Sequence, residues 1–148
     1  MRLLATSLLL FASLAQTQTA VGQVYEILDC KGRVCTIARN GGGIVERFEQ
    51  TAASVHRNDQ LVIVDRPCAS ACALLADKAR DRVCITPSAK FMFHRGVNIV
   101  TRQEILVFHS RDIAEWIQSR GGFPSNPSGL FLEMTYGQAR QFWPACNR

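Results

Sequence analysis

The amino-acid sequence predicts an α/β protein with one domain, and three observations carry this prediction. Apolar residues recur at helical spacing between residues 44 and 55, with charged residues on the opposite face. The β-branched run over 61–64 follows directly and has the length and composition of a buried parallel strand. Short apolar runs and helical stretches continue to alternate toward the carboxyl end, which is typical of α/β architecture.

The first half of the domain contains three expected strands and one helix. Short strands over 24–28 and 34–38 flank Gly32, which we expect to turn a hairpin. A glycine loop over 41–43 then precedes a helix that begins at Ile44 and that Asn58 and Asp59 end. The strand over 61–64 completes a βαβ unit with this helix.

The second half continues the same alternation. A helix is expected over 71–79, followed by strands over 83–85 and 90–94. Thr101 and Glu104 have the spacing of a capping box, which predicts a helix through Ile105 to Ile117 that Gly121 and Gly122 end. Thr135 and Gln138 predict a last short helix before Pro144. We read Trp116 and Trp143 as core residues.

Residues 1–22 have the features of a secretory signal peptide. A positive charge at Arg2 precedes an apolar run over 3–15, and small residues follow at positions suited to cleavage. The alternative is an anchoring helix, but the apolar run is shorter than the roughly 20 residues that a bilayer needs. We therefore expect a periplasmic or secreted domain over 23–148, with no membrane-spanning segment after cleavage.

The charge and composition of the chain do not favour a nucleic-acid-binding function. The formal net charge of the chain is +5, and removal of Arg2 lowers it by one, to +4. The basic residues are scattered and form no run, so we expect no nucleic-acid partner.

The even number of cysteines in an exported chain favours disulfides, with 15 connectivities open. A bridge from Cys30 to Cys35 across the Gly32 turn is the best single pairing. Zinc is the competing interpretation, because Cys68, Cys72 and Cys84 lie near one another, but no Cys-x-x-Cys or paired histidines accompany them. A reactive thiol at Cys72 is a further alternative. The full set of cysteines is Cys30, Cys35, Cys68, Cys72, Cys84 and Cys146.

The residues with the clearest chemistry are a serine at a strand-to-helix junction and a histidine at a later strand end. Ser70 opens the helix over 71–79, and His94 ends the strand over 90–94. Histidine is the usual base that activates a serine hydroxyl. The Ala71 N–H, in the first turn of a helix, is free to stabilise an oxyanion, and the glycine loop offers a second donor beside it. We expect no metal or other cofactor for such chemistry.

The order of these motifs resembles the Clp-type serine peptidases of the crotonase superfold, and related uncharacterised exported proteins. Their glycine loop, serine and histidine follow at similar spacing: Gly42 lies 28 positions before Ser70, and His94 lies 24 after it. The resemblance runs from about residue 34 to residue 94. It implies a small Clp- and crotonase-like fold of repeated ββα units and a peptide or protein substrate. It also implies that Ser70 is the nucleophile and His94 the base, and that Gly42 or Gly43 acts with Ala71 as the oxyanion hole. Related peptidases assemble into rings, so a homo-oligomer is one state that the resemblance allows.

The chain departs from that family in three places. The usual Ser-Pro before the glycines is Arg39-Asn40, and the part before the glycine loop is much shorter. The family's third catalytic residue, an aspartate, would fall near residues 131–133, where Glu133 is the acidic residue. Glu133 is therefore the candidate to orient His94, and Asp112 is the other carboxylate considered for that position. Lys78 and Lys90 are the lysines nearby, and neither has a position that argues for a Ser-Lys pair.

Two functions of different classes follow from these residues. The first is a serine hydrolase, specifically a peptidase, with Ser70 as the nucleophile. The second is a catalytically inactive binding or assembly module on the same fold, in which Ser70 only caps a helix, His94 is structural and the glycines form a tight turn. An acyl-CoA enzyme fits poorly, because coenzyme A is an intracellular cofactor.

Overall fold

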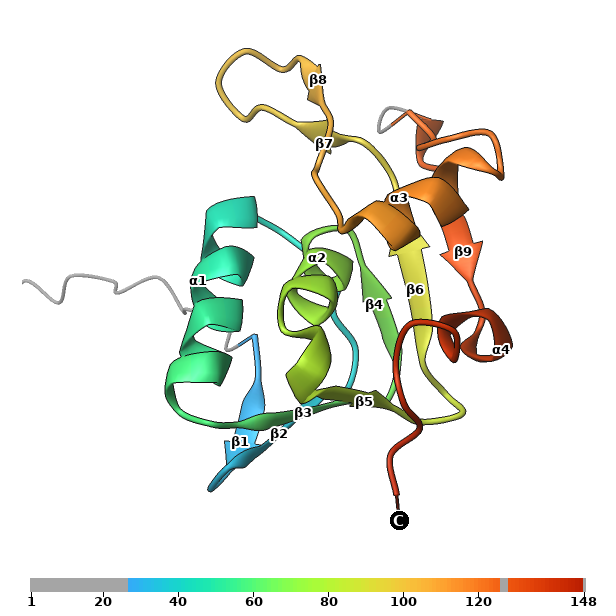
Figure 1. Ribbon diagram of the computed structural model, residues 1–148. Helices are drawn as coiled ribbons and strands as arrows, with labels where there is room; N and C mark the ends of the chain where they lie inside the picture. Colours follow the sequence, from blue (N-terminus) through green and yellow to red (C-terminus); the bar gives the residue numbers. More distant parts are fainter. Residues whose placement is uncertain (1–26, 126–127, 148) are drawn as a thin grey trace, which may run out of the picture.

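The computed structural model describes residues 27–125 and 128–147, so the expected signal peptide lies outside the described residues. The described chain is a mixed α/β structure with two main sheets, a small hairpin and four α-helices (Figure 1). This agrees with the α/β class that the sequence predicts.

The first sheet holds four strands in the order β1-β2-β3-β5. β1 pairs with β2 in an antiparallel hairpin through Gly32, whereas β3 runs parallel to both β2 and β5. The bounds are Asp29–Lys31 for β1, Val34–Ile37 for β2, Leu61–Val64 for β3 and Val83–Ile85 for β5. The predicted strand over 24–28 is wrong at residues 27 and 28, which precede β1, and residues 24–26 lie outside the described part.

The second sheet has the order β4-β6-β9. β4 (Pro67–Ala69) runs parallel to β6 (Lys90–Phe93), and β9 (Leu132–Met134) is antiparallel to β6. The segment around Asn40 pairs with β4 on its other side, through hydrogen bonds from Asn40 N to Pro67 O and from Ala69 N to Asn40 O. The glycine loop is thereby attached to the outer edge of this sheet.

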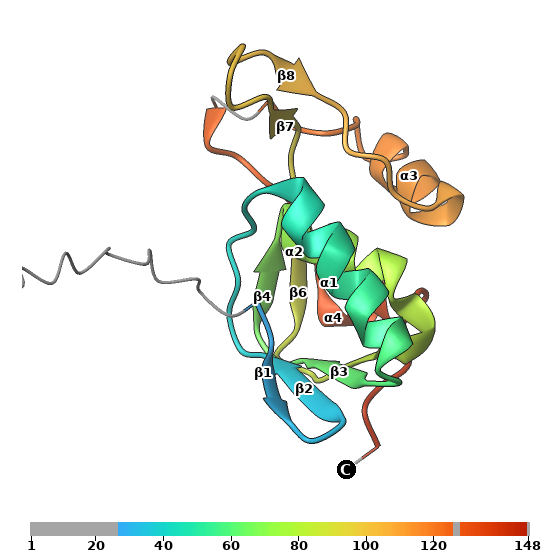
Figure 2. The same cartoon turned by 90° about the vertical axis from the view of Figure 1, so that its left-hand side faces the viewer.

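Two central helices pack against each other and cover the sheets (Figure 2). α1 (Val45–Arg57) buries Phe48, Ala52 and Val55, which are spaced as a helix face requires. α2 (Ala71–Lys78) is buried from Ala71 through Asp77 and lies at the centre of the core. Both helices confirm the helices that the sequence predicts for these segments.

Two smaller helices complete the fold. α3 (Arg111–Gln118) packs Ile113, Trp116 and Ile117 into the core. The capping box of Thr135 and Gln138 is present in α4 (Tyr136–Ala139) as predicted, and a 3₁₀ turn over Arg80–Arg82 follows α2.

A strand–strand–helix unit recurs along the chain. β2 passes into the Asn40 segment and then α1, and β3 passes into β4 and then α2. β5 passes into β6, and α3 follows after an insertion. In each unit the first strand belongs to the first sheet and the second strand to the second sheet.

The expected helix opened by Thr101 and Glu104 is wrong over its first half. Residues 96–105 form a hairpin of β7 (Gly96–Val97) and β8 (Glu104–Ile105), which projects from the body in Figure 1. Asn98 Oδ1 accepts hydrogen bonds from the backbone of Val100 and Thr101, so its side chain closes a tight turn there. The side chain of Glu104 instead binds Arg95.

All six cysteines form disulfides: Cys30–Cys35, Cys68–Cys72 and Cys84–Cys146. The first is the bridge across the hairpin that the sequence favours. Neither a zinc site nor a thiol nucleophile is therefore available from these cysteines. Three disulfides are consistent with a protein of an extracellular or periplasmic compartment.

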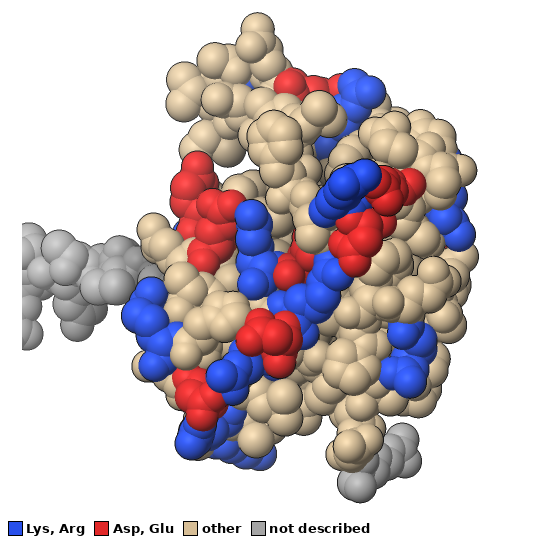
Figure 3. Space-filling view, in the orientation of Figure 1, with Lys and Arg blue, Asp and Glu red and all other residues tan. Residues whose placement is uncertain are grey.

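The surface bears on two further expectations. Over α1 and α2, charges of both signs intermingle in Figure 3, without a large patch of one sign on this face. No helix within residues 27–125 and 128–147 is long and apolar enough to cross a bilayer.

Candidate active site

Ser70 lies on a sharp turn between β4 and α2, in a backbone conformation that L-residues rarely adopt. Its φ is 55° and its ψ is −123°, which lies outside the left-handed helical region that other positive-φ residues use. Such a conformation is unfavourable by about 1–3 kcal/mol and persists only where the surroundings enforce it. A serine held in this way resembles the strained strand-to-helix elbow on which α/β-hydrolases present their nucleophile.

The backbone of Ser70 is held by its neighbours, whereas its hydroxyl is left open. Ser70 N donates to Met92 O at 2.8 Å, and Ser70 O accepts from Ala73 N at 2.9 Å. Within the described part of the chain the hydroxyl makes no hydrogen bond, including the capping bond expected of a serine at a helix start. Its φ and ψ also differ from the extended values of an N-cap. Helix capping therefore does not explain this serine.

The Cys68–Cys72 disulfide brackets this turn. Cys68 belongs to β4 and Cys72 to the first turn of α2, and both are fully buried. The bridge therefore ties the strand to the helix on either side of Ser70.

The glycine loop lies against this turn, as the sequence predicts. A Cβ atom on Gly42 would stand 2.7 Å from Ala69 O, 2.7 Å from the Ser70 Cβ and 3.0 Å from Ala71 N, and the φ of Gly42 is +86°. Only glycine fits such a position. At Gly41, by contrast, an added Cβ would have nothing within 4 Å.

Two backbone N–H groups beside Ser70 are available to bind an anion. Neither Ala71 N–H nor Gly43 N–H has an acceptor among the described residues. Gly42 N–H instead donates to Asn40 Oδ1 at 2.9 Å, so Gly43 is the better candidate of the two glycines. Ala71 also begins α2, whose positive dipole end favours a developing negative charge.

His94 directly follows β6, the strand that pairs with β4 and so lies next to the Ser70 turn. The register pairs Ala69 with Met92, so the chain reaches Ser70 and His94 at the same end of adjacent parallel strands. Burial lowers the pKa of His94 below its usual 6.5, against the opposing effects of the Arg95 backbone and the charge of Glu104. His94 is thus held neutral near pH 7, the form in which an imidazole accepts a proton. No hydrogen bond joins it to the Ser70 hydroxyl among the described residues.

The structure does not bring the candidate third residue to His94. Glu133 pairs with Met92 in the sheet register, and its carboxylate binds Lys90 Nζ at 2.9 Å. The ring beside His94 is instead that of Phe131, with centroids 4.8 Å apart in an edge-to-face contact. Asp112 is likewise occupied, because its carboxylate binds Arg80. Glu104 is the carboxylate whose charge acts on His94.

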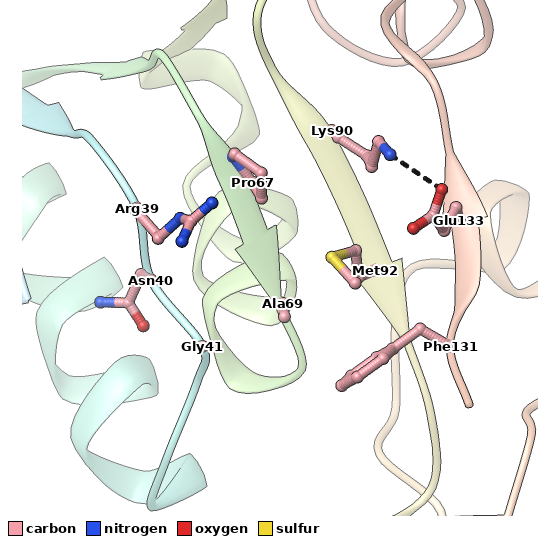
Figure 4. Close-up of a pocket in the computed structure, with 9 residues that line it drawn as sticks. All are labelled: Arg39, Asn40, Gly41, Pro67, Ala69, Lys90, Met92, Phe131 and Glu133. Carbon is pink, nitrogen blue, oxygen red and sulfur yellow. Dashed lines mark hydrogen bonds and ion pairs between the residues drawn. The ribbon is translucent and has the colours of Figure 1, made fainter. Parts of the chain in front are cut away.

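A groove of about 460 Å³ lies along the outer face of the second sheet, and Ala69, the residue before Ser70, is part of its lining (Figure 4). Its floor is apolar, and charged side chains stand along its walls. Alternation along the strands separates this face from the core: Lys90 and Met92 line the groove, whereas Phe91 and Phe93 are buried beneath it. The lining residues are Arg39, Asn40, Gly41, Pro67, Ala69, Lys90, Met92, Phe131 and Glu133.

A buried polar cluster around Asp77 was missed by the sequence reasoning. Asp77 accepts hydrogen bonds from Ser110 N at 2.7 Å and from Arg80 Nη2 at 2.6 Å, and it contacts His109 Nδ1 at 3.2 Å. The side chain of His109 is only 3% exposed. The cluster joins the end of α2 to the start of α3, at the opposite end of α2 from Ser70. It serves the fold rather than the candidate site.

The described residues contain no group of three or more metal-ligating side chains that could hold an ion. No protein-family model matches the chain, and no curated protein matches its sequence.

Proposed function

We propose that the protein is an exported serine hydrolase, specifically a peptidase, with Ser70 as its nucleophile and His94 as its general base. The observation that carries this proposal is the strained backbone of Ser70, which presents a hydroxyl without a hydrogen-bond partner among the described residues. Backbone strain at a single residue is common in catalytic sites. Here the Cys68–Cys72 disulfide and the glycine loop hold the strained residue in place.

The chemistry assigns a role to each neighbouring group. Ser70 Oγ attacks the carbonyl carbon of a peptide bond while His94 takes its proton, and the carbonyl oxygen becomes an oxyanion that accepts from Ala71 N–H and Gly43 N–H. Collapse of this intermediate breaks the C–N bond, and His94 returns the proton to the leaving amine. Water then hydrolyses the acyl-serine in the same way, with His94 again as the base.

Ser70 Oγ and the His94 ring make no hydrogen bond with each other among the described residues, so they must approach before this chemistry begins. Catalytic hydrogen bonds are often long in the absence of substrate and shorten in the complex. Burial lowers the pKa of His94 and so favours its neutral, proton-accepting form.

The proposal includes a Clp- and crotonase-like fold and a periplasmic or secreted location. The recurring strand–strand–helix unit supports the fold, together with the placement of the glycine loop beside the serine turn. The three disulfides support an oxidising compartment.

A labelling experiment tests the proposal. The oxidised wild-type protein is treated with a fluorophosphonate probe, and the modified residue is mapped by mass spectrometry. We expect labelling on Ser70, no labelling of Ser70→Ala, and normal labelling of Ser88→Ala, which changes an exposed loop serine. A folded wild-type protein that is never labelled on Ser70 would contradict the proposal.

An inactive binding or assembly module is the second candidate. It is favoured by the absence of Glu133 and Asp112 from His94, since both carboxylates are held by cations elsewhere. In that case Ser70→Ala should reproduce every property of the wild type, whereas substitutions that disrupt the fold should not.

A further inference from the structure

The groove beside Ser70 has an apolar floor and one cation, Arg39, that forms no ion pair with any residue the structure describes. Pro67, Ala69, Met92 and Phe131 supply the apolar surface. Its volume of about 460 Å³ lies within the range of ligand sites, roughly 300–1,000 Å³. A ligand there would bury apolar groups on the floor while its polar groups meet the walls.

The charges along the walls do not cancel. Lys90 and Glu133 form an ion pair at 2.9 Å across β6 and β9, drawn as the dashed line in Figure 4. Arg39, on the opposite wall, has no ion pair or side-chain hydrogen bond with any described residue, whereas Arg33, Arg80 and Arg82 each bind an aspartate. The groove therefore carries one net positive charge beside an apolar surface. An arginine so placed is suited to a carboxylate, which it can bind through two parallel hydrogen bonds.

The sheet pairing fixes how far this charge lies from Ser70. Asn40 pairs with Cys68, so Arg39 lies beside Pro67, where its side chain extends in Figure 4. Pro67 is three residues before Ser70, which corresponds to about 10 Å along an extended strand. A peptide lying extended in the groove, with its reacting carbonyl at Ser70, would place a side chain two or three residues away next to Arg39.

We infer that the groove binds an extended peptide that carries an aspartate or glutamate side chain two or three residues from the bond held at Ser70. Arg39 is the specificity-determining residue, and Met92 and Phe131 take the apolar side chains between. This inference rests on the proposed function for the location of the reacting bond, but its binding step does not require Ser70 to react.

The test measures binding with the Ser70→Ala protein, which cannot turn over its ligand. The probes are short alanine–leucine peptides, labelled with fluorescein at the amino end and amidated at the carboxyl end, with one glutamate at successive positions. We expect fluorescence anisotropy to show one preferred glutamate position, where glutamine weakens binding by about fivefold or more. The additional change Arg39→Gln should remove this preference, whereas Arg57→Gln, at the exposed end of α1, should keep it.

A charge exchange makes the test specific. Arg39→Glu in the same protein should disfavour the glutamate peptide and favour a peptide with lysine at that position. Equal binding of glutamate and glutamine peptides would overturn the inference, even if Ser70 proves reactive. It would also be overturned if a glutamate-free peptide, made for comparison with a free carboxyl end, bound as tightly as the amidated glutamate peptide. Failure of fluorophosphonate labelling alone would overturn the hydrolase and leave selective binding intact.

Discussion

Gly42 and Ser70 lie in direct contact, so closely that a single methyl group on Gly42 would stand 2.7 Å from the Ser70 Cβ. The contact joins two segments that one helix and two strands separate in the sequence. It determines both the position of the proposed oxyanion donors and the tolerance of the turn to substitution.

Gly42→Ala should therefore remove the reactivity of Ser70. The new Cβ collides with the backbone at Ala69 and Ala71, and alanine is also strained at a φ of +86°. Fluorophosphonate labelling of Ser70 measures the effect, and circular dichroism establishes that the variant is folded. Gly41→Ala is the matched control, because its Cβ meets nothing within 4 Å. Equal labelling of the two variants would argue against a functional contact.

Ser70→Gly should be more stable than Ser70→Ala by about 1 kcal/mol or more, although neither variant can react. Glycine adopts the positive φ of this turn without strain, whereas alanine keeps the strain. Urea unfolding provides the two free energies. At Ser54, within α1, the same pair of substitutions should give the opposite order, because glycine is unfavourable in a helix by about 1 kcal/mol. A Ser70→Ala variant as stable as Ser70→Gly, or more stable, would show that the turn stores no strain.

The rate of Ser70 labelling should rise with pH and reach half its maximum below pH 6.5. Burial lowers the pKa of His94, so its neutral, proton-accepting form persists to lower pH than for an exposed histidine. His94→Gln should slow labelling and remove this pH dependence. His56→Gln changes an exposed histidine on α1 and should leave the profile unchanged. A midpoint above pH 7 would contradict the assigned base.

Asp77→Asn should destabilise the fold by about 3 kcal/mol at neutral pH, because it removes one of the two carboxylates that bind Arg80 and leaves the Ser110 backbone N–H without its charged acceptor. Burial alone would raise the pKa of Asp77, but hydrogen bonds from His109, Ser110 and Arg80 outweigh it and hold the pKa well below 3.8. Because folding lowers this pKa, its contribution is complete above about pH 4 and declines as the pH falls further.

Thermal unfolding between pH 2 and pH 5 measures this contribution. The wild type should lose stability steeply below about pH 4, whereas Asp77→Asn should lose much less over the same range. Asp29→Asn, on the exposed strand β1, is the control and should follow the wild type. Parallel curves for wild type and Asp77→Asn would refute the assignment.

The double variant Cys84→Ala/Cys146→Ala should lose more stability than Cys30→Ala/Cys35→Ala. The first bridge spans 62 positions and the second spans 5, so the chain-entropy model gives losses of about 4 and about 2 kcal/mol. Differential scanning calorimetry of the two oxidised variants tests the order. A larger loss from the hairpin pair would show that entropy in the unfolded chain is not the dominant effect.

Local patterns were sufficient to predict most of the fold. The helix face of Phe48, Ala52 and Val55 and the β-branched run over 61–64 each appear where the sequence places them, because burial and periodicity agree there. The segment after Thr101 differs, because the Asn98 side chain closes a hairpin turn that competes with the helix. The hydrogen bonds of the Asn98 side chain therefore favour a hairpin turn, and the capping-box spacing of Thr101 and Glu104 alone does not start a helix.

The candidate site was predictable only in part. Ser70, the glycine loop and His94 could be located from their order, since parallel strands bring their ends together. The partners of Glu133 and Asp112 depend on cross-strand and inter-helix contacts that spacing does not encode. The sequence does not indicate a binding role for Arg39, because its position beside Pro67 depends on the pairing of Asn40 with Cys68.

Because the Cys68–Cys72 disulfide spans the Ser70 turn, the compartment in which the protein is expressed affects every assay of Ser70. Protein made in a reducing cytosol would lack the disulfide across the Ser70 turn, even if its circular dichroism spectrum matched that of a folded domain. A negative result from such material would describe the reduced form alone. Expression with export to an oxidising compartment, followed by a thiol count, should therefore precede every measurement on Ser70.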